Sequence, residues 1–208
     1  MILYVDRFWI SPYAFSSFVA LREKKIDFEP REIGLDRADQ RSAEYRARSI
    51  TGRVPALVDG DFALAESQAI AEYLEDVRPE PPIFPRAPRD RARARQVLAW
   101  IRSDLDALRA ERPTHTMFYA RATAPLSPAG VAAAEKLVAV AERLVPIGRT
   151  QLFDAWCLAD ADLAFMLHRL ILNGHDVPAP VRAFAEVQWA RPSVAEWVAH
   201  ARPAYVAY

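Results

Sequence analysis

The sequence predicts a two-part protein, a mixed α/β N-terminal half followed by an all-helical C-terminal half. Strand and helix patterns alternate before residue 79, and only helical periodicity follows the linker after it. Between the halves, PEPPIFPRAP at 79–88 holds five prolines in ten positions. Proline removes a main-chain donor and restricts the residue before it, so this stretch is typical of a stiff linker. We therefore expect an N-terminal domain over residues 1–78, a linker over 79–88 and a helical domain over 89–208.

The N-terminal half divides into seven predicted elements. Its first strand is a continuous apolar run, as expected of a strand buried on both faces. Pro30 places the second strand at a sheet edge, because proline cannot donate to a ladder. The turn Asp59-Gly60-Asp61 is a hairpin signal between the last two strands. The expected order is βαβαββα, with strands at 2–5, 28–33, 56–58 and 62–65 and helices at 15–24, 37–47 and 70–77.

The C-terminal half shows three apolar stripes at helical spacing and no strand pattern. Pro128, Pro180 and Pro192 stand where helices would start, a position that tolerates the missing N–H. The stripes are Val97, Ile101, Leu105 and Leu108; Ala134, Leu137, Val138, Ala141, Leu144 and Val145; and Leu163, Met166, Leu167, Leu170 and Ile171.

Composition excludes several classes of function. Lys plus Arg equals Asp plus Glu at 27 each, so no net charge attracts nucleic acid or anionic membranes. The dispersed glycines exclude nucleotide-binding loops, and the single cysteine, Cys157, excludes a disulfide framework or CxxC pair. The histidines lack metal-ligand spacing. No apolar run reaches the roughly 18–20 residues of a membrane span, and MILYVDRF is unlike a secretory signal. We expect a cytoplasmic protein that needs no metal and binds neither nucleic acid nor membranes.

Ser11-Pro12 follows the first strand and is well suited to open a helix, because serine is a favoured N-cap and proline a favoured first residue. A helix N-terminus at the carboxyl end of a central strand is a natural anion site. The alternative is that Ser11 only caps the helix.

Two further pairs of residues are candidates for ligand binding. Val54-Pro55 precedes the third strand, either as an ordinary turn or as a cis peptide that presents the Val54 N–H and C=O to a peptide-like ligand. Glu66-Ser67 opens the third helix, where capping chemistry is the alternative to binding.

Taken together, SPYA at 11–14, GRVPALVDGDFALAESQAIAEYL at 52–74, the proline-rich linker and the helical second half resemble the glutathione S-transferase family over nearly the whole chain. The resemblance implies the glutathione transferase fold with a thioredoxin-like N-terminal domain. VPAL and ESQAI are its most specific motifs. They imply that cis-Pro55 lets Val54 pair with the cysteinyl part of glutathione, and that Glu66 and Ser67 bind the γ-glutamyl end.

The resemblance also implies that the Ser11 hydroxyl points at the glutathione sulfur. A free thiol has a pKa of about 8.5, and lowering it by two units requires about 2.7 kcal/mol. A hydroxyl bonded to a charged acceptor supplies about 1.5–3 kcal/mol, and a helix end about 0.3–2 kcal/mol. We therefore expect Ser11 to act as a hydrogen-bond donor to the thiolate, and not as a nucleophile or base.

Other residues are candidates for the rest of the site. Arg53 is a candidate for the glycyl carboxylate, and an exposed loop arginine is the equal alternative. Asp104 matches an acidic position that in similar proteins reaches across a homodimer toward the γ-glutamyl amine; otherwise it is a solvated helix charge. Phe8, Trp9 and Tyr13 are placed near the co-substrate pocket, with a purely core position as the alternative, because aromatic residues are more often core.

At a finer level the chain resembles a bacterial theta-like, serine-type group with transferase and peroxidase activity. SPYAF, RVPAL, RARARQ, WIRSDL and ERPT carry this likeness, and the missing SSCS motif disfavours maleylacetoacetate isomerisation. The expected function is to activate glutathione, as a substrate rather than a resident cofactor, against small hydrophobic electrophiles or hydroperoxides, as in detoxification. Cys157 is expected to be a packed structural thiol. The alternatives are a non-catalytic interaction module with this fold and a glutathione-dependent disulfide reductase.

Overall fold

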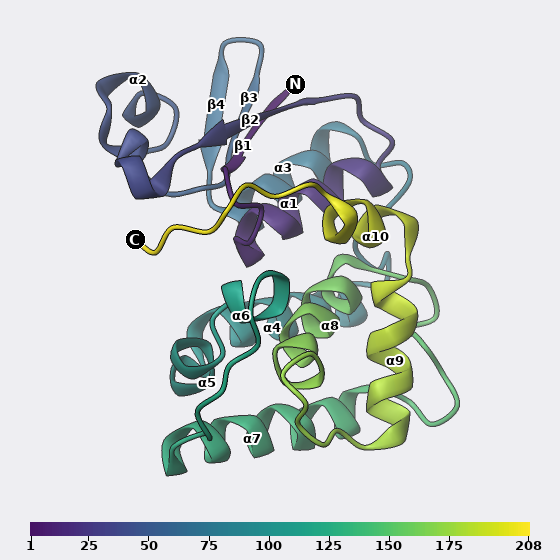
Figure 1. Cartoon of the computed structure of the whole chain (residues 1–208). Coiled ribbons are helices and arrows are strands. Elements are labelled where there is room, and N and C mark those ends of the chain that lie inside the picture. Colours follow the sequence, from purple (N-terminus) through teal and green to yellow (C-terminus); the bar gives the residue numbers. More distant parts are fainter. The chain divides into compact units, whose positions relative to one another are not determined.

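The computed structural model describes all 208 residues, which form two compact units (Figure 1). One unit contains residues 1–83 and 196–208, and the other contains residues 84–195. The last thirteen residues therefore differ from the expected division, which placed them in the helical domain. They join the N-terminal unit because Trp197 is fully buried against the rings of Trp9, Phe15 and Phe18.

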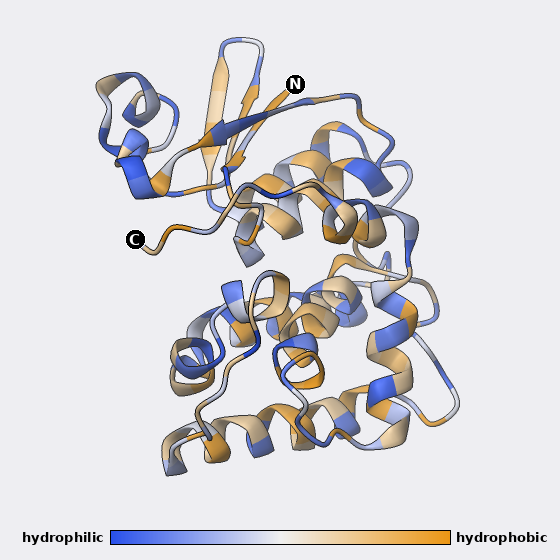
Figure 2. Ribbon diagram, in the orientation of Figure 1, coloured by the Kyte–Doolittle hydropathy of each residue, from blue (hydrophilic) through white to orange (hydrophobic).

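The N-terminal unit is built on a four-stranded sheet with the order β2-β1-β3-β4. Strand β1 pairs in parallel with β2 and antiparallel with β3, and β3 pairs antiparallel with β4. The predicted thioredoxin-like order is confirmed, and Pro30 lies on the edge strand, which Figure 2 shows as hydrophilic. The strands are β1 (Ile2–Asp6), β2 (Glu29–Ile33), β3 (Ala56–Asp59) and β4 (Phe62–Ala65).

Helices α1 (Pro12–Glu23) and α3 (Ser67–Val77) lie side by side against the sheet (Figure 1). A buried ion pair joins them: Nζ of Lys24 lies 2.6 Å from Oε2 of Glu75. The same ammonium donates to the carbonyls of Arg78 and Pro81, and the carboxylate accepts from the N–H of Ile83. One pair of charges therefore ties two helices to the start of the linker.

The polar helix predicted at 37–47 is wrong as a single element. Two short 3₁₀ turns, η1 (Leu35–Arg37) and η2 (Asp39–Arg41), precede the one-turn helix α2 (Ala43–Arg46). Side-chain bonds compete with a continuous helix here: Asp39 accepts from the N–H of Gly34, and Ser42 caps α2. Ala38 between the turns has a left-handed φ of 59°.

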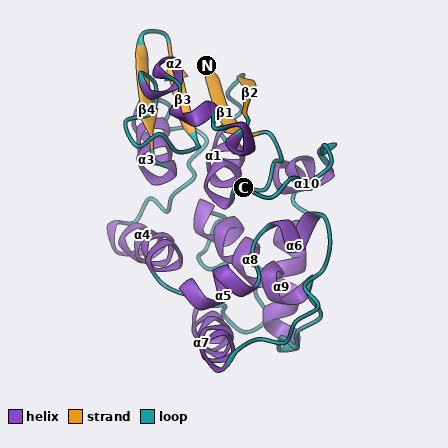
Figure 3. Cartoon of the chain, turned by 60° about the vertical axis from the view of Figure 1, so that its left-hand side comes forward, coloured by secondary structure: helices purple, strands orange, loops and turns teal.

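The other unit is helical, as predicted, and is arranged around α8, which is buried along most of its length between α4 and α9 (Figure 3). The predicted proline starts are confirmed for α7, α9 and α10. Helix α10 crosses the boundary between the units at 195–196. None of the helices combines the length and apolar character that crossing a membrane would require. The helices are α4 (Pro88–Ser103), α5 (Asp106–Glu111), α6 (His115–Phe118), α7 (Pro128–Leu144), α8 (Leu158–Ile171), α9 (Ala179–Trp189) and α10 (Pro192–Ala199).

The first predicted stripe of this unit spans two helices and not one. Helix α4 ends at Ser103, and Leu105 has a left-handed φ of 65° before α5 begins. Val97, Ile101, Leu105 and Leu108 are nevertheless all buried. The spacing of the apolar residues therefore predicts correctly that these four residues are buried, but it does not predict that the helix ends between Ile101 and Leu105.

The N-terminus of α8 carries a capping box made by Cys157 and Asp160. Oδ2 of Asp160 accepts from the N–H of Cys157 at 2.8 Å, and Oδ1 accepts from the N–H of Leu152 at 2.7 Å. Burial raises the pKa of Asp160 to about 6, although these hydrogen bonds act in the opposite direction. Burial also raises the pKa of the Cys157 thiol, which fits the packed structural role expected for it.

The raised pKa of Asp160 makes stability depend on pH. The folded protein binds this proton more tightly than an unfolded chain does, so the contribution of this carboxyl to stability is greatest below its unfolded pKa of 3.8 and falls until about pH 6. Asp160→Asn cannot titrate. Between about pH 3.8 and pH 6, the free energy of unfolding of wild type should fall relative to that of the variant, by about 1.4 kcal/mol for each pH unit. Denaturant titrations at several pH values measure this difference, and a constant difference would contradict the expectation.

Candidate functional site

Strand register brings three chain segments to one edge of the sheet. Tyr4 near the end of β1 pairs with Ala56 at the start of β3, and Ala56 pairs with Ala65 at the end of β4. The loop that leads from β1 to Ser11, the Val54-Pro55 pair before β3 and the Glu66-Ser67 pair after β4 therefore all lie at this edge. These three segments, which are far apart in the sequence, together form one candidate site.

Ser11 is the N-cap of α1, as predicted. Its Oγ accepts a hydrogen bond from the N–H of Ala14 at 3.2 Å, and Pro12 occupies the first helical turn. This bond uses an oxygen lone pair, and the hydroxyl proton of Ser11 is donated to no group of the protein. Capping and donation to a ligand are therefore compatible at this residue.

Asp6 is a residue of the site that the sequence analysis missed. Its fully buried carboxylate accepts from the N–H of Ile10 and the N–H of Ser11, both at 2.9 Å. Burial raises the pKa of Asp6, and these two donors and the charge of Arg202 act against that rise. An acidic residue directly after a buried apolar strand was the signal that could have revealed it.

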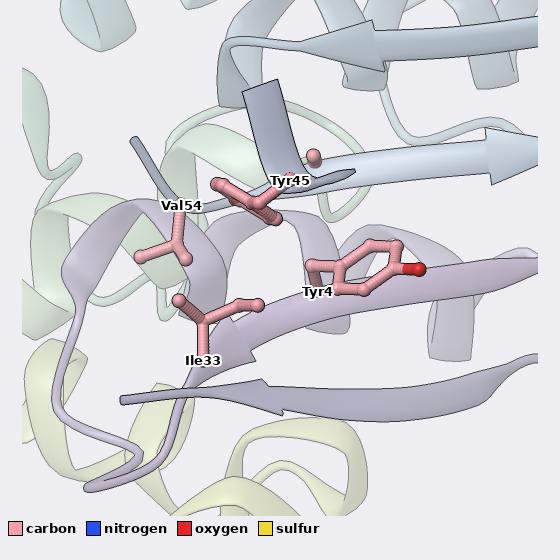
Figure 4. Close-up of a cluster of buried hydrophobic side chains, with 5 residues drawn as sticks. Tyr4, Ile33, Tyr45 and Val54 are labelled. Atoms are coloured by element: carbon pink, nitrogen blue, oxygen red, sulfur yellow. The ribbon is translucent and has the colours of Figure 1, made fainter. Parts of the chain in front are cut away.

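The Val54-Pro55 peptide bond is cis. Val54 is only 8% exposed, yet its main-chain N–H and C=O form no hydrogen bond within the protein. Its side chain packs in a cluster with Tyr4, Ile33, Tyr45 and Ala56, in which the side chains of Val54 and Ile33 face each other (Figure 4).

Tyr45 and Ser49 hold the residue before Val54 in place, and the sequence analysis missed both. Oη of Tyr45 and Oγ of Ser49 donate to the carbonyl of Arg53 at 2.8 and 2.9 Å. The guanidinium of Arg53 is exposed and forms no ion pair. The exposed loop arginine expected as one alternative is therefore what the structure shows, with its charge available to a ligand.

Glu66 precedes α3 in an unusual backbone conformation, with a φ of 73° and a ψ of 113°. A positive φ in a residue other than glycine costs energy, and such residues cluster at functional sites. Glu66 occupies the N-cap position, but its exposed side chain forms no capping bond. Ser67, the first residue of the helix, is buried. The first N–H groups of α3 have no partners within the helix, which makes its N-terminus suitable for an anion.

Asp104 belongs to the helical unit and is already engaged there. Oδ2 accepts from Nε1 of Trp100 at 3.0 Å and from Nζ of Lys136, and Oδ1 accepts from the N–H of Leu105. The Lys136 ammonium, with these other donors, lowers the pKa of Asp104 to about 2. Asp104 is therefore a partly exposed, ionised carboxylate with several partners in its own chain, and its expected role across a homodimer stays a prediction.

The three aromatic candidates for a co-substrate pocket have different environments. Phe8 and Trp9 are buried, and Trp9 stacks on His200 with ring centroids 3.6 Å apart. Tyr13 is 37% exposed. Phe8 and Trp9 are therefore core residues, which is the alternative left open for them, and Tyr13 alone of the three is accessible to a ligand.

Comparisons with known proteins agree with this architecture. Residues 7–82 match the family model for the glutathione S-transferase N-terminal domain, and residues 88–202 match the model for its C-terminal domain. The chain is 36% identical over 98 residues to glutathione S-transferase Z1 of Arabidopsis thaliana, an alignment that covers 47% of this chain and 44% of that protein. The chain thus spans about half the length of the curated relatives it matches.

Two solved structures are similar over almost the full chain. A glutathione transferase homolog from Burkholderia GL BGR1, with bound glutathione, is 42% identical, with 95% of both chains covered and a TM-score of 0.79. A maleylacetoacetate isomerase from Methylobacterium extorquens AM1, with bound malonate and GSH, is 29% identical, with 98% of this chain and 100% of that chain covered and a TM-score of 0.74.

Proposed function

The chain belongs to the glutathione S-transferase family, and we propose that it binds glutathione at the sheet edge formed by Ser11, Val54 and Ser67. Ser11 stabilises the glutathione thiolate, which reacts with a small hydrophobic electrophile or a hydroperoxide. The cytoplasm is the fitting location, because glutathione is kept reduced there.

The observation that carries this proposal is that the Ser11 hydroxyl donates its proton to no group of the protein. Because Oγ accepts the capping bond from Ala14 through a lone pair, its O–H remains available to donate to a sulfur anion. A hydrogen bond from a hydroxyl to a charged acceptor contributes about 1.5–3 kcal/mol, enough to lower a thiol pKa by one to two units.

The unpaired main chain of Val54 supports a second part of the proposal. Buried N–H and C=O groups are almost always hydrogen-bonded in proteins. Those of Val54 are not, although the residue is buried. The cysteinyl residue of glutathione carries one N–H and one C=O, which satisfy both groups in the manner of an added strand.

Charged groups at the same edge fit the two ends of the tripeptide. The Glu66 carboxylate binds the γ-glutamyl amine, and Ser67 with the N-terminus of α3 binds the adjacent carboxylate. Arg53 binds the glycyl carboxylate. In a homodimer, the Asp104 carboxylate of the other subunit adds a second anionic partner for the amine.

Two reactions follow from a bound thiolate. In transfer, the sulfur forms a bond to an electrophilic carbon and a leaving group departs with its electron pair, or the carbon acceptor is protonated. In peroxide reduction, the sulfur attacks one peroxide oxygen, the O–O bond breaks and the alkoxide takes a proton. A second glutathione then displaces hydroxide from the oxidised sulfur, which gives glutathione disulfide and water.

The theta-like peroxidase group is the finer assignment that we propose, on the strength of SPYAF and its accompanying segments. The similarity to a maleylacetoacetate isomerase favours a second candidate, cis-trans isomerisation by reversible addition of the thiolate to a double bond. The absence of SSCS at the helix start, where this chain has SPYA at 11–14, weighs against it. Product analysis separates the candidates: a conjugate indicates transfer, glutathione disulfide indicates peroxide or disulfide reduction, and an isomerised maleylacetoacetate analogue indicates isomerase activity.

Glutathione binding is tested by calorimetric titration of wild type and Glu66→Ala with reduced glutathione. The variant loses a charge-assisted hydrogen bond of about 1.5–3 kcal/mol, so the dissociation constant should rise by about 10- to 150-fold. Asp76→Ala is the matched control, because this exposed acid lies at the other end of the same helix. Equal affinities of wild type and Glu66→Ala would contradict the assigned site. No binding at all would favour a non-catalytic interaction module.

A further inference from the structure

Two oppositely charged side chains hold a single peptide group in the loop before Ser11. The carbonyl of Trp9 accepts from Nε and Nη2 of Arg202 at 3.3 and 3.1 Å. The N–H of Ile10, on the other side of the same peptide bond, donates to Oδ2 of Asp6 at 2.9 Å. Oδ1 of Asp6 accepts from the N–H of Ser11 itself. Arg202 thus binds the carbonyl end of the Trp9–Ile10 peptide group, and Asp6 binds its N–H end.

This peptide group follows a backbone conformation that needs support. Trp9 has a φ of 52°, in the left-handed region that bulky residues rarely adopt. All three hydrogen bonds to this peptide group involve a charged side chain, and such bonds are roughly twice as strong as neutral ones. Without them, the loop would be expected to relax toward ordinary φ values, and the Ser11 N–H and hydroxyl would move with it.

Arg202 also connects the loop to the C-terminal segment. Its guanidinium donates to the carbonyls of Trp197, Val198 and His200, so it lies within the turn that ends α10. His200 stacks on the ring of Trp9. The geometry of the loop therefore depends on residues that lie 193 positions away in the sequence.

We propose that Asp6 and Arg202 act as a peptide clamp, the pair of charges that grips the Trp9–Ile10 peptide group, and that this clamp orients the Ser11 hydroxyl toward the glutathione sulfur. Both are positioning residues, since neither touches the reacting atoms. The inference rests on the proposed function, in which Ser11 stabilises the thiolate. Hydrogen-bond strength falls steeply with angle, so a loosened Ser11 donates less well to the sulfur even where glutathione still binds.

The test is the pKa of the thiol of bound glutathione, measured from the ultraviolet absorbance of the thiolate as a function of pH. In Arg202→Met, this pKa should rise by about one unit, a tenfold lower ratio of thiolate to thiol at a given pH. The dissociation constant of glutathione, measured at acidic pH where the thiol is protonated, should change by less than about threefold. A variant that only destabilised the fold would leave the bound thiol pKa unchanged.

Two further variants separate orientation from charge. Arg202→Lys keeps the positive charge but loses the two guanidinium donors to the Trp9 carbonyl, so it should still raise the thiol pKa. A wild-type thiol pKa in this variant would mean that the charge alone acts, and would overturn the clamp. Asp6→Asn removes a negative charge, which by charge alone would lower the thiol pKa. The clamp predicts the opposite, a rise, because an amide cannot accept from both N–H groups with the same geometry.

The control is Arg22→Met. Arg22 also pairs with the C-terminal segment, through Glu196, but forms no hydrogen bond or ion pair with the loop before Ser11. Its bound thiol pKa should equal that of wild type. If wild type itself shows no lowered thiol pKa, the proposed function fails and the clamp with it. If wild type lowers the pKa and Ser11→Ala abolishes this, while Arg202→Lys and Asp6→Asn leave it unchanged, the clamp alone is overturned.

Discussion

Ser11→Ala is expected to lower the turnover number for glutathione-dependent reactions by about 10- to 150-fold, which corresponds to the loss of about 1.5–3 kcal/mol of thiolate stabilisation. The affinity for glutathione should change far less, because the proposed site assigns the rest of the tripeptide to Val54, Glu66 and Ser67. Steady-state kinetics at saturating glutathione measure the effect, and the activity lost at neutral pH should partly return at higher pH, where the thiol ionises unaided.

Loss of the helix cap is the main confounding effect of this substitution, since an N-cap serine contributes about 1 kcal/mol. The chain offers a matched control in Ser127, which also precedes a proline and caps its helix by accepting from the N–H of Gly130 at 3.1 Å. The Ser127 hydroxyl also donates to Oε1 of Glu111 at 2.6 Å, so Ser127→Ala should lose at least as much stability as Ser11→Ala and still keep full turnover. If Ser11→Ala turns over as fast as wild type, Ser11 is a cap and nothing more.

Lys24→Met is expected to lower the free energy of unfolding by about 3–5 kcal/mol, the usual cost of leaving one member of a buried ion pair without its partner. Both side chains of the pair are buried, with 0% of Lys24 and 9% of Glu75 exposed. The substitution also removes the donor to the carbonyls of Arg78 and Pro81. Chemical denaturation measures the change.

The double variant Lys24→Met/Glu75→Gln should recover much of this loss, because the glutamine is neutral and still accepts from the N–H of Ile83. Arg31→Met is the contrasting control: its partner Glu29 and Arg31 itself are exposed, so stability should stay the same within error. A loss in Lys24→Met no larger than in Arg31→Met would mean that the buried pair contributes nothing beyond its packing.

Several features of the site could be predicted because they depend on neighbouring residues. Ser11-Pro12 opens a helix through bonds within one turn, and Asp59-Gly60-Asp61 turns a hairpin. The βαβαββα order then follows from periodicity. From this order, the antiparallel pairing brings the segments before β3 and after β4 to one edge of the sheet.

Other features depend on residues that meet only after folding. In the sequence, Asp6 is only a charged residue at the end of a strand. In the folded loop, its carboxylate accepts hydrogen bonds from the N–H groups of Ile10 and Ser11. The hydroxyls of Tyr45 and Ser49 find the Arg53 carbonyl across a turn. The break before Leu105 was hidden for a related reason, since apolar spacing reports which residues are buried and not whether the backbone stays helical between them.

The sequence by itself determined the division into an α/β half and a helical half, the family resemblance and the positions of Ser11, Val54, Glu66 and Ser67 at segment ends, because short-range backbone preferences and local motifs encode these. Only the tertiary structure decided that the C-terminal segment joins the N-terminal unit and that Arg202 grips the loop before Ser11. A contact between residues so far apart has no local pattern, because its free energy comes from burial and charge pairing that exist only once the sheet, α1 and the C-terminal segment are assembled.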